Sequence, residues 1–475
     1  MPDLAEPAAT RPPAAAVRGD SAQGNGAERR AAHAARQERA LAAFRHAAGT
    51  GGKLGLAKPT SNLFRDRSDT GKKKLDISGF TQVLEVNAAE GWIESEGMVT
   101  YEDLTAAALA HGLMPAVVPE LKTITLGGAA AGVGIEASSF KYGLVHETLL
   151  GMDVLTGDGR VLACTPDNEH ADLFHGMPNS YGTLGYALKL RARAVPVLPY
   201  VELRHERYSD ATKFFEALQK ACDPRGADFV DAVAFRPGDL VLNTGRFVER
   251  APFSSDYTYE RIYYRSLRDK ELDYLTVADF IWRWDTDWFW CSKNVGAQNP
   301  IIRRLYGKAR LGSRTYQRIM RWNSRHGWTK VIDKLRGGHS ESVIQDVDIP
   351  IENAPAFLEF FQREIGLEPV WLCPLSSGAG PRFPLYPVPP GKLYVNFGFW
   401  DVLHKSAPKA PGHYNRLIER EVARLSGIKS LYSASYFTPE EFRAAYGGDS
   451  YKALKDKYDP ARRFPELYDK CVLGH

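Results

Sequence analysis

Residues 125–143 read TLGGAAAGVGIEASSFKYG, a small and apolar run that contains five glycines. A glycine inside a regular element costs roughly 0.5–1 kcal/mol relative to alanine, so the run predicts irregular backbone that bends sharply or lies closely against something. Two interpretations compete. The glycines could let backbone pack on backbone, or their N–H groups could converge on a phosphate because no side chain keeps it away.

Common nucleotide-binding motifs do not explain this glycine stretch. No Gly-Lys-Ser/Thr closes it, as a P-loop would require, and it is not the dinucleotide fingerprint G-x-G-x-x-G. The segments around it predict a strand-rich domain. Residues 74–100 are typical of a strand meander, residues 100–112 of a helix capped by Thr100, and residues 149–166 of a hairpin.

Composition limits the classes of protein that remain. A chain of 475 residues predicts two or three domains, and 61 basic against 57 acidic residues give no indication of nucleic-acid binding. The five cysteines show no metal-ligand spacing, so we expect reduced thiols, no metal site and a cytoplasmic protein. No apolar run approaches the ~18 residues of a membrane span. Residues 1–48 predict disorder followed by a solvated helix with a basic face.

Several longer segments carry a resemblance to a known family. They read PELKTITLGGAAAGVGIEASSFKYGL (119–144), DLFHGMPNSYGTLGY (172–186), VIQDVDIPI (343–351), PVWLCPL (369–375), KLYVNFG (392–398) and YDPARRFPELYDKC (458–471). In order and spacing they resemble FAD-binding oxidoreductases of the vanillyl-alcohol oxidase (PCMH) type, and more narrowly the Δ24-sterol reductase family. The chain is at least as similar to a bacterial branch that reduces a methylene group on a fatty-acyl chain.

This resemblance implies an α+β, two-domain PCMH-type FAD-binding fold with a C-terminal cap domain built on an antiparallel sheet. Residues 1–48 would form a disordered and helical extension, residues 49–200 the FAD-binding domain, and residues 201–475 the cap and substrate domain. Residues 354–365 predict a helix between two sheet strands of the cap, and residues 313–337 predict a further helix outside it.

The resemblance also implies FAD as cofactor, with its pyrophosphate along residues 125–137. The residues expected to bind FAD are Ser61 and Asn62 in a first loop, Thr125, Leu126, Gly127, Gly128, Gly132, Val133, Gly134, Ile135, Glu136, Ser138, Ser139, Tyr142 and Gly143 in a central loop, and Gly182, Thr183 and Gly185 in a third. The first loop holds no His or Cys for covalent attachment, so we expect non-covalent FAD, with His146 as the remaining attachment candidate. NADPH as electron donor follows from the resemblance alone.

Residues 282–291, WRWDTDWFWC, supply what the reduction of an isolated C=C bond requires, an acid and a water-free aromatic pocket. The candidate acids are Asp287 and Asp285, with Asp346 as a third. The predicted substrate pocket consists of Trp282, Trp284, Trp288, Phe289, Trp290, Tyr394 and Asn396. Sterol reductases carry a different stretch here, so Asp285 and Asp287 are not carried over from them. The aromatic patch could equally serve core packing, a dimer contact or docking at a membrane surface.

Three hypotheses about function follow. The first is an FAD-dependent, NADPH-driven reductase of an isolated C=C bond in a lipid, either a methylene-branched fatty-acyl chain, slightly favoured, or a sterol side chain. The second is an oxidase or dehydrogenase of the same fold that uses oxygen or another acceptor. The third is a lipid-binding protein that keeps flavin only as structure. The expected partners are a lipid and a membrane surface, without nucleic acid, and the oligomeric state stays open.

Overall fold

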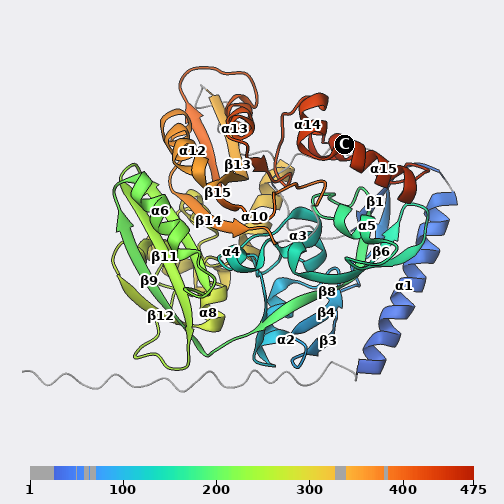
Figure 1. Cartoon of the computed structure of the whole chain (residues 1–475), viewed down its shortest axis with the longest axis horizontal. Coiled ribbons are helices and arrows are strands. Elements are labelled where there is room, and N and C mark those ends of the chain that lie inside the picture. Colours follow the sequence, from blue (N-terminus) through green and yellow to red (C-terminus); the bar gives the residue numbers. More distant parts are fainter. Residues whose placement is uncertain are drawn as a thin grey trace, which may run out of the picture.

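The computed structural model describes residues 26–49, 51–57, 64, 71–326, 339–378 and 383–474. Two antiparallel sheets dominate this part of the chain, one formed by residues up to 196 and the other by residues from 200 onward (Figure 1). A separate parallel pair joins β1 (Leu54–Ala57) to β2 (Lys73–Asp76). The architecture is α+β, with the antiparallel cap sheet in the C-terminal half, as predicted.

The first sheet has the strand order β3-β4-β8-β6-β7, and β5 pairs with the far end of β8. Its strands are β3 (Val83–Asn87), β4 (Trp92–Glu96), β5 (Leu113–Pro115), β6 (Leu149–Thr156), β7 (Val161–Cys164) and β8 (Gly185–Pro196). The predicted hairpin is therefore confirmed as β6–β7. The predicted meander is confirmed only for the antiparallel pair β3–β4, because β2 pairs with β1 in the separate parallel pair.

Short helices surround this sheet. They are α2 (Tyr101–Leu109), α3 (Leu126–Gly132), α4 (Ser139–Tyr142), the 3-10 turn η1 (Val145–Thr148) and α5 (Ala171–Gly176). α2 begins after Thr100, as predicted, and the Thr100 side chain accepts a hydrogen bond from Asp103 N. The glycine stretch differs from expectation, since its first half forms helix α3. The Thr125 side chain caps this helix, and three consecutive alanines offset the unfavourable glycines.

The N-terminal helix α1 (Gly26–Gly49) packs against the first sheet and is not fully solvated, contrary to expectation. His33 and Phe44 are buried in the contact. His33 Nδ1 and Arg36 Nε each lie 2.8 Å from Glu96 Oε1, and the Glu96 side chain is fully buried. The polar, alanine-rich helix α1 is thus held in place by the buried carboxylate of Glu96. The composition of the helix did not indicate this contact.

The second sheet has the order β12-β9-β11-β10-β14-β15-β13-β16. Its strands are β9 (Tyr200–Tyr208), β10 (Phe229–Arg236), β11 (Asp239–Val248), β12 (Leu272–Thr276), β13 (His339–Pro350), β14 (Val370–Ser376), β15 (Leu393–Lys405) and β16 (Ile428–Lys429). One face is covered by α6 (Ala211–Ala221), α12 (Ala354–Phe360) with its continuation η5 (Phe361–Ile365), and α13 (His413–Arg424) (Figure 1). A phenylalanine-rich core lies between them.

The other face of this sheet carries the segment from residue 249 to residue 326. It contains α7 (Tyr263–Ser266), α8 (Val277–Ile281), η2 (Cys291–Val295), α9 (Pro300–Tyr306), η3 (Lys308–Arg310) and α10 (Ser313–His326). The helix predicted over residues 313–337 is present as α10, and its remainder lies outside the described residues. A further short turn, η4 (Ile351–Asn353), precedes α12.

The C-terminal helices return to the first sheet. They are α14 (Pro439–Ala445), α15 (Gly448–Tyr458) and α16 (Leu467–Cys471), and α15 lies beside α5 in Figure 1. The buried Lys455 Nζ donates a 2.6 Å hydrogen bond to Thr183 O and lies 2.7 Å from Asp459 Oδ2. The end of the chain therefore helps to build the N-terminal half. The division into domains after residue 200 falls at the first residue of β9 and stays a prediction.

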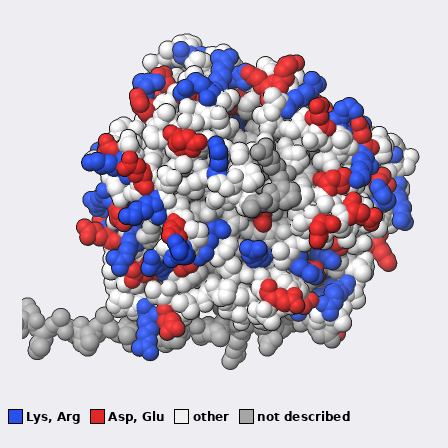
Figure 2. All heavy atoms as spheres, viewed as in Figure 1, with Lys and Arg blue, Asp and Glu red and all other residues white. Residues whose placement is uncertain are grey.

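The surface in Figure 2 carries both charge signs interspersed, without a large region of one sign on the face shown. Among the described residues, no helix has the length and apolar character needed to span a bilayer.

Candidate functional site

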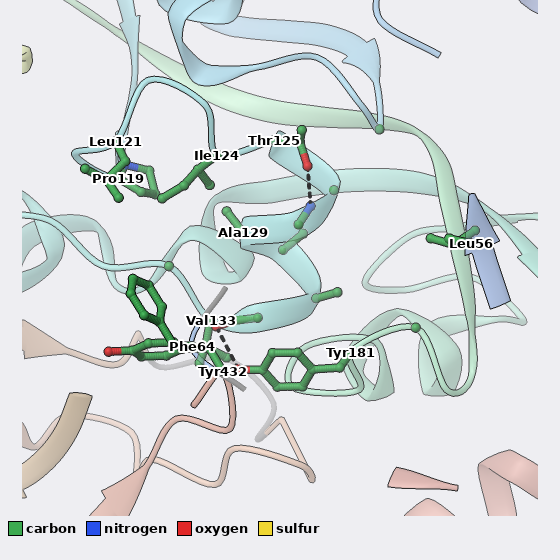
Figure 3. A pocket seen from close by; sticks show the side chains of 18 of the residues that line it. Leu56, Phe64, Pro119, Leu121, Ile124, Thr125, Ala129, Val133, Tyr181 and Tyr432 are labelled. Carbon is green, nitrogen blue, oxygen red and sulfur yellow. Dashed lines mark hydrogen bonds between the residues drawn. The ribbon is translucent and has the colours of Figure 1, made fainter. Parts of the chain in front are cut away.

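A cavity of about 740 Å³ lies where the two sheets meet. Its wall combines the glycine stretch, the turn before β8, the aromatic stretch after α8 and strands β13–β15 of the second sheet. In Figure 3, residues 119–133 form one side, and Phe64, Tyr181 and Tyr432 lie near the C-terminal end of α3. The cavity therefore brings together residues of the predicted central and third cofactor loops and part of the predicted substrate pocket.

The glycines of the central stretch have different neighbours. A Cβ on Gly127 would lie 2.7 Å from Gly97 O, and one on Gly134 would lie 2.9 Å from Pro119 Cγ. Both positions therefore need glycine for close packing. A Cβ on Gly132 would have no neighbour closer than Tyr181 Cε1 at 3.4 Å, and Gly132 lines the cavity. Backbone packing therefore explains Gly127 and Gly134, whereas Gly132 has room beside the cavity, and phosphate binding there stays a prediction.

The third loop approaches the end of α3 through Tyr181. Its hydroxyl donates a 3.4 Å hydrogen bond to Gly132 O (Figure 3). Tyr181 and Gly182 both have positive φ, of 50° and 76°, and a sharp turn follows into β8. A Cβ on Gly185 would lie 2.5 Å from Val154 Cγ1, so glycine is needed there for packing on β6.

The predicted cofactor residues divide into two groups. Those that line the cavity are Thr125, Gly127, Gly128, Gly132, Val133, Gly134, Ile135, Gly182 and Gly185. Those that do not are Leu126, Glu136, Ser138, Ser139, Tyr142, Gly143 and Thr183. Ser61 and Asn62 lie outside the described residues.

Hydroxyl groups of the second group are engaged inside the protein. Ser138 Oγ donates to Ala116 O at 2.7 Å, Ser139 Oγ accepts from Glu136 N at 3.1 Å, and Thr183 Oγ1 donates to Ser180 O at 2.8 Å. They hold the loops in shape. His146 is also absent from the cavity wall, and burial lowers its pKa to about 3.

Three lysines that were not predicted also line the cavity, namely Lys72, Lys74 and Lys470. Positive side chains beside small, glycine-bearing backbone favour an anionic group such as a diphosphate. The signal available in the sequence was the lysine run 72–74, which leads into β2.

Aromatic rings close the opposite end of the cavity. Trp288 lies 5.1 Å from Tyr316 between ring centroids, and Phe289 lies 4.6 Å from Trp400. Trp371 and Tyr432 complete this wall. The arrangement is apolar and largely shielded from water, and aromatic faces of this kind stabilise a cation by roughly 0.5–2 kcal/mol each.

The other predicted pocket residues do not line the cavity. Trp284 and Trp290 are buried behind it, where Trp284 stacks on Phe289 at 4.9 Å. Trp282 is half-buried, and Lys122 Nζ lies 5.7 Å from its ring centre. Tyr394 and Asn396 lie on β15, and Asn396 Nδ2 donates a 2.7 Å hydrogen bond to Asp348 Oδ1. Most of the aromatic stretch thus packs behind the wall.

Asp346 on β13 is the one of the three candidate acids that lines the cavity. Burial, reinforced by the charge of Asp348, raises its pKa to about 8, although a hydrogen bond with Tyr432 acts in the opposite direction. Its Oδ1 has no hydrogen-bond partner and points toward Gly398, where a Cβ would lie 2.8 Å away. At neutral pH this carboxyl group is mostly protonated beside the aromatic wall.

Asp285 and Asp287 are buried but lie off the cavity wall. Asp285 accepts hydrogen bonds from Lys122 N at 3.3 Å and Ser313 N at 3.4 Å, so it connects the 122 loop to the start of α10. Asp287 Oδ1 accepts from Trp290 N at 3.1 Å, and burial raises the Asp287 pKa to about 7. Asp285 thus ties the aromatic stretch to neighbouring segments, and Asp287 stabilises a turn within it.

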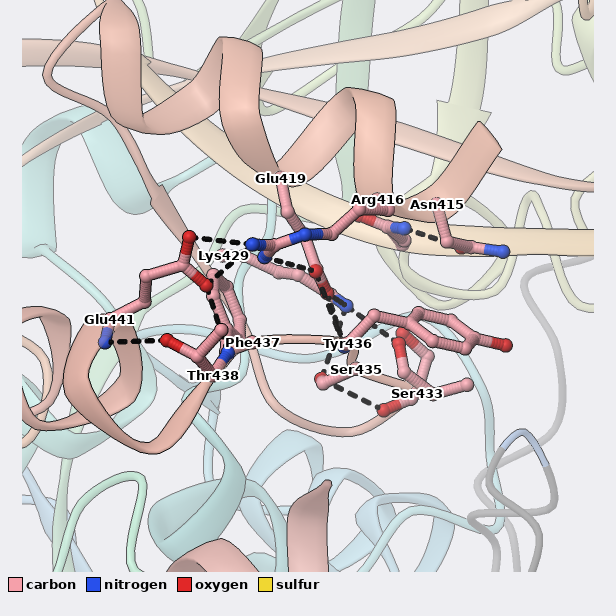
Figure 4. Close-up of polar contacts among 12 residues, drawn as sticks. Asn415, Arg416, Glu419, Lys429, Ser433, Ser435, Tyr436, Phe437, Thr438 and Glu441 are labelled. Carbon is pink, nitrogen blue, oxygen red and sulfur yellow. Dashed lines mark hydrogen bonds and ion pairs between the residues drawn. The ribbon is translucent and has the colours of Figure 1, made fainter. Parts of the chain in front are cut away.

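A network of buried charges supports the segment that carries Tyr432 (Figure 4). Lys429 Nζ lies 2.8 Å from Glu419 Oε1, and both side chains are fully buried. Lys429 Nζ also donates to Ala434 O at 2.6 Å, and Glu419 accepts from Tyr436 N at 3.0 Å. These bonds fix residues 429–436 between α13 and the cavity.

A second carboxyl group, Glu120, lines the cavity and was not predicted. It belongs to a buried cluster with Glu136 and Asp231. Arg283 Nη2 lies 2.7 Å from Glu136 Oε1 and from Asp231 Oδ2, so this guanidinium already occupies the centre of the cluster. Burial and the neighbouring Glu136 raise the pKa of Glu120 well above its usual value.

Comparison with known proteins assigns the class of the N-terminal half. Residues 32–165 match a family model described as an FAD binding domain. The chain thus contains an FAD-binding domain, which together with the relatives below supports an FAD-dependent oxidoreductase.

The named relatives confirm the resemblance to Δ24-sterol reductases. The chain is 28% identical to Delta(24)-sterol reductase of Homo sapiens over 408 residues, 82% of this chain and 75% of that protein. It is 24% identical to Delta(24)-sterol reductase of Pisum sativum over 442 residues, 84% of this chain and 76% of that protein. It is also 28% identical to Cytokinin dehydrogenase 7 of Oryza sativa subsp. japonica over 179 residues, 36% of this chain and 32% of that protein.

The residues around the cavity fit FAD. A volume of about 740 Å³ falls within the ~300–1,000 Å³ typical of small-molecule sites. Gly132 leaves the end of α3 open toward the cavity, and Lys72 and Lys74 add positive charge. Tyr181 and Gly182 would then border the cofactor on the side of the third loop.

Proposed function

We propose that this protein is an FAD-dependent reductase that saturates an isolated carbon–carbon double bond in a lipid, with NADPH as electron donor. The observation that carries the proposal is the position of Asp346, a half-buried carboxyl group with a shielded Oδ1 and a pKa of about 8, in a cavity whose wall is otherwise aromatic at that end. The similarity to named sterol reductases supports the same class of reaction.

The reaction needs one proton and one hydride. Reduced FAD, when bound, supplies the hydride. Asp346 holds the proton at its carboxyl group and delivers it to the less substituted alkene carbon, which leaves a tertiary cation on the substrate. The rings of Trp288, Phe289 and Trp400 stabilise that cation and exclude water, which would otherwise trap it as an alcohol. The Asp346 carboxylate then regains a proton from solvent.

The substrate lacks a polar group at the reacting carbons, so apolar contact has to position it. We favour a methylene-branched fatty-acyl chain over a sterol side chain. The support is that this aromatic stretch departs from the sterol reductases, which carry a His- and Arg-bearing stretch at the same place.

The alternative is an oxidase or dehydrogenase of the same fold. It would remove hydride from its substrate and pass the electrons to oxygen or another acceptor. One of the similar proteins, Cytokinin dehydrogenase 7, is named as a dehydrogenase. A non-catalytic flavin-containing lipid-binding protein is the third hypothesis. An acid held protonated at neutral pH favours the reductase, because an oxidase needs a base at that place.

The test uses the FAD-loaded protein under anaerobic conditions. NADPH should bleach the flavin absorbance, and added methylene-acyl lipid should restore it while the lipid gains the mass of two hydrogens. A sterol with a Δ24 double bond is the parallel substrate. Flavin that is reduced by neither NADPH nor NADH, or reduced flavin that reacts with oxygen and with neither lipid, would refute the proposal.

Asp346→Asn tests the proton donor. This variant should keep flavin reduction by NADPH and lose lipid turnover by about 100-fold or more, as expected for removal of a general acid. Asp287→Asn is the matched control, since Asp287 is a buried aspartate that lies off the cavity wall. If Asp287→Asn abolishes turnover and Asp346→Asn does not, the proton donor is Asp287.

A further inference from the structure

We infer that α9, η3 and α10 form a docking surface for an anionic lipid membrane, here named the α9–α10 surface and defined as residues 300–322. This segment contains seven Lys or Arg residues and no Asp or Glu, although acidic and basic residues are nearly balanced in the whole chain. The inference goes beyond the proposed reaction, because it assigns a binding surface and the chemistry of its partner.

The apolar part of this surface lies on α9. Ile301 is 72% exposed and Leu305 is 77% exposed, the highest values among the large apolar side chains of the described residues. The two residues are four apart, so they share one face of the helix. Trp322, near the end of α10, is 51% exposed. Removal of large apolar side chains from water is favourable, so their exposure here indicates an apolar partner.

The charged part surrounds the apolar part. Arg304 pairs with Glu260 and Arg314 with Glu102. Lys308, Arg310 and Arg318 are exposed and form no ion pair with a carboxylate of the described residues. Cations beside the headgroups of anionic lipids each strengthen binding by about fivefold. Exposed isoleucine, leucine and tryptophan next to such cations are typical of surfaces that lie in the membrane interface.

A membrane explains both parts of the surface together. A nucleic acid would engage the cations but leave Ile301 and Leu305 in water, since phosphate contacts are polar. A second copy of the chain would bury the apolar side chains but bring the cations of two copies together, because a symmetric contact places the same patch on both subunits. Anionic lipid covers the apolar residues with acyl chains and neutralises the cations.

Helix α10 of this surface also reaches the cavity. Tyr316 of α10 lines the cavity wall against Trp288, whereas Arg314 and Arg318, two residues to either side, are exposed. α10 thus separates the cavity from the docking surface by the thickness of one helix. Docking there would place the cavity wall beside the bilayer that contains the lipid.

The experiment measures sedimentation of the full-length, FAD-loaded protein with vesicles, without NADPH, so that binding is separated from turnover. One set of vesicles is phosphatidylcholine, and the other is an equimolar mixture of phosphatidylcholine and phosphatidylglycerol. Binding should be at least tenfold tighter to the anionic set and should weaken with added salt. Absence of binding to both sets overturns the inference, and it would leave the proposed reaction untouched.

Two variants test the two parts of the surface. Ile301→Asn with Leu305→Asn should weaken binding to both sets of vesicles by about tenfold or more. Lys308→Gln with Arg310→Gln and Arg318→Gln should weaken binding to the anionic set by about 100-fold and change binding to the neutral set little. These side chains are exposed, so the thermal unfolding midpoint should stay within a few degrees of the parent protein.

Matched control variants carry the same kinds of substitution at exposed residues outside the α9–α10 surface. Phe253→Asn removes another exposed apolar side chain, and Lys213→Gln with Lys220→Gln removes two exposed cations on α6. Neither should change vesicle binding by more than about twofold. Equal losses in controls and test variants overturn the inference. A concentration-dependent dimer abolished by the Ile301/Leu305 variant, or duplex DNA that binds through the cations without vesicle binding, overturns it as well.

Discussion

Asp346 shows at the scale of one residue how position changes the chemistry of a side chain. An aspartate at the surface is ionised at neutral pH, but Asp346 lies half-buried in the cavity wall near the buried Asp348 and has a pKa of about 8. Asp348 itself is held by hydrogen bonds from Tyr386 and Asn396, and burial raises its pKa to about 6. The protonated form of Asp346 is therefore the form that the fold favours.

This shift predicts a pH-dependent stability. The folded pKa of Asp346 lies above its unfolded value. The contribution of Asp346 to the free energy of unfolding is therefore fully present below pH 3.8 and is lost as pH rises toward about 8. Asp346→Asn should remove up to about 1.4 kcal/mol per pH unit from the slope of unfolding free energy against pH in this window. Urea unfolding at a series of pH values measures it. The exposed Asp269→Asn is the control, and an unchanged slope in Asp346→Asn would contradict the assigned pKa.

Two glycines of the central stretch should respond differently to substitution. Gly132→Leu would extend into the cavity and should weaken FAD binding at least about tenfold, with the unfolding free energy changed by less than about 1.5 kcal/mol. Gly127→Ala would collide with Gly97 O and should lower stability by about 1–3 kcal/mol. Flavin absorbance after gel filtration and urea unfolding separate the two effects. The same outcome for both variants would argue against the different roles.

FAD should be released intact when the protein is denatured. The first loop contains no His or Cys, and His146 does not line the cavity. Acid precipitation should therefore give a colourless pellet and a yellow supernatant whose absorbance accounts for the flavin originally bound. A yellow pellet that loses its colour in a His146→Ala variant would identify covalent attachment at that residue.

At the scale of elements, a two-residue strand holds one wall of the cavity. β16 contributes Lys429, whose ammonium group is paired with Glu419 of α13, and residues 430–436 follow directly (Figure 4). Arg416 of the same helix pairs with Glu441 at the start of α14. Buried ion pairs of this kind fix geometry, although apolar replacements of both partners can be equally stable.

Removal of one partner of this pair should be costly. Lys429→Met leaves Glu419 buried without its cation and should lower the unfolding free energy by about 3–5 kcal/mol. Lys429→Met combined with Glu419→Leu should recover much of that loss. Urea unfolding of the single and double variants gives the comparison. A double variant that is no more stable than Lys429→Met would show that hydrogen bonds to the chain, such as that to Ala434 O, outweigh the ion pair.

At the scale of the whole molecule, the cavity exists because two sheets from different parts of the chain are held together. Arg283 connects them, since it pairs with Glu136 beside the central loop and with Asp231 on β10. Asn179 Nδ2 adds a 2.6 Å hydrogen bond to Leu385 O across the same boundary. Loss of the charged connection should affect both stability and the cofactor site.

Arg283→Met should lower the unfolding free energy by about 3–5 kcal/mol, because Glu136 and Asp231 are left buried without a cation. FAD affinity should fall in parallel, since the central loop loses its anchor to the second sheet. Arg265→Met, at an exposed position off the cavity where the side chain donates a hydrogen bond to Gln298 Oε1, is the control. Arg283→Met protein with unchanged stability would indicate that the carboxylates are protonated and need no counter-ion.

The sequence by itself determined the local elements and the class of cofactor site. Thr100 before α2, the turn at the tip of the β6–β7 hairpin and the glycine stretch are local signals, because capping, turn geometry and glycine backbone freedom depend on adjacent residues. Tertiary structure alone decided which side chains meet. Asp346 and Trp400 reach the cavity from β13 and β15, whereas Asp287, inside the aromatic stretch, turns into the core. The direction of a side chain and its burial depend on strands that pair over long sequence separations, and no local pattern encodes them.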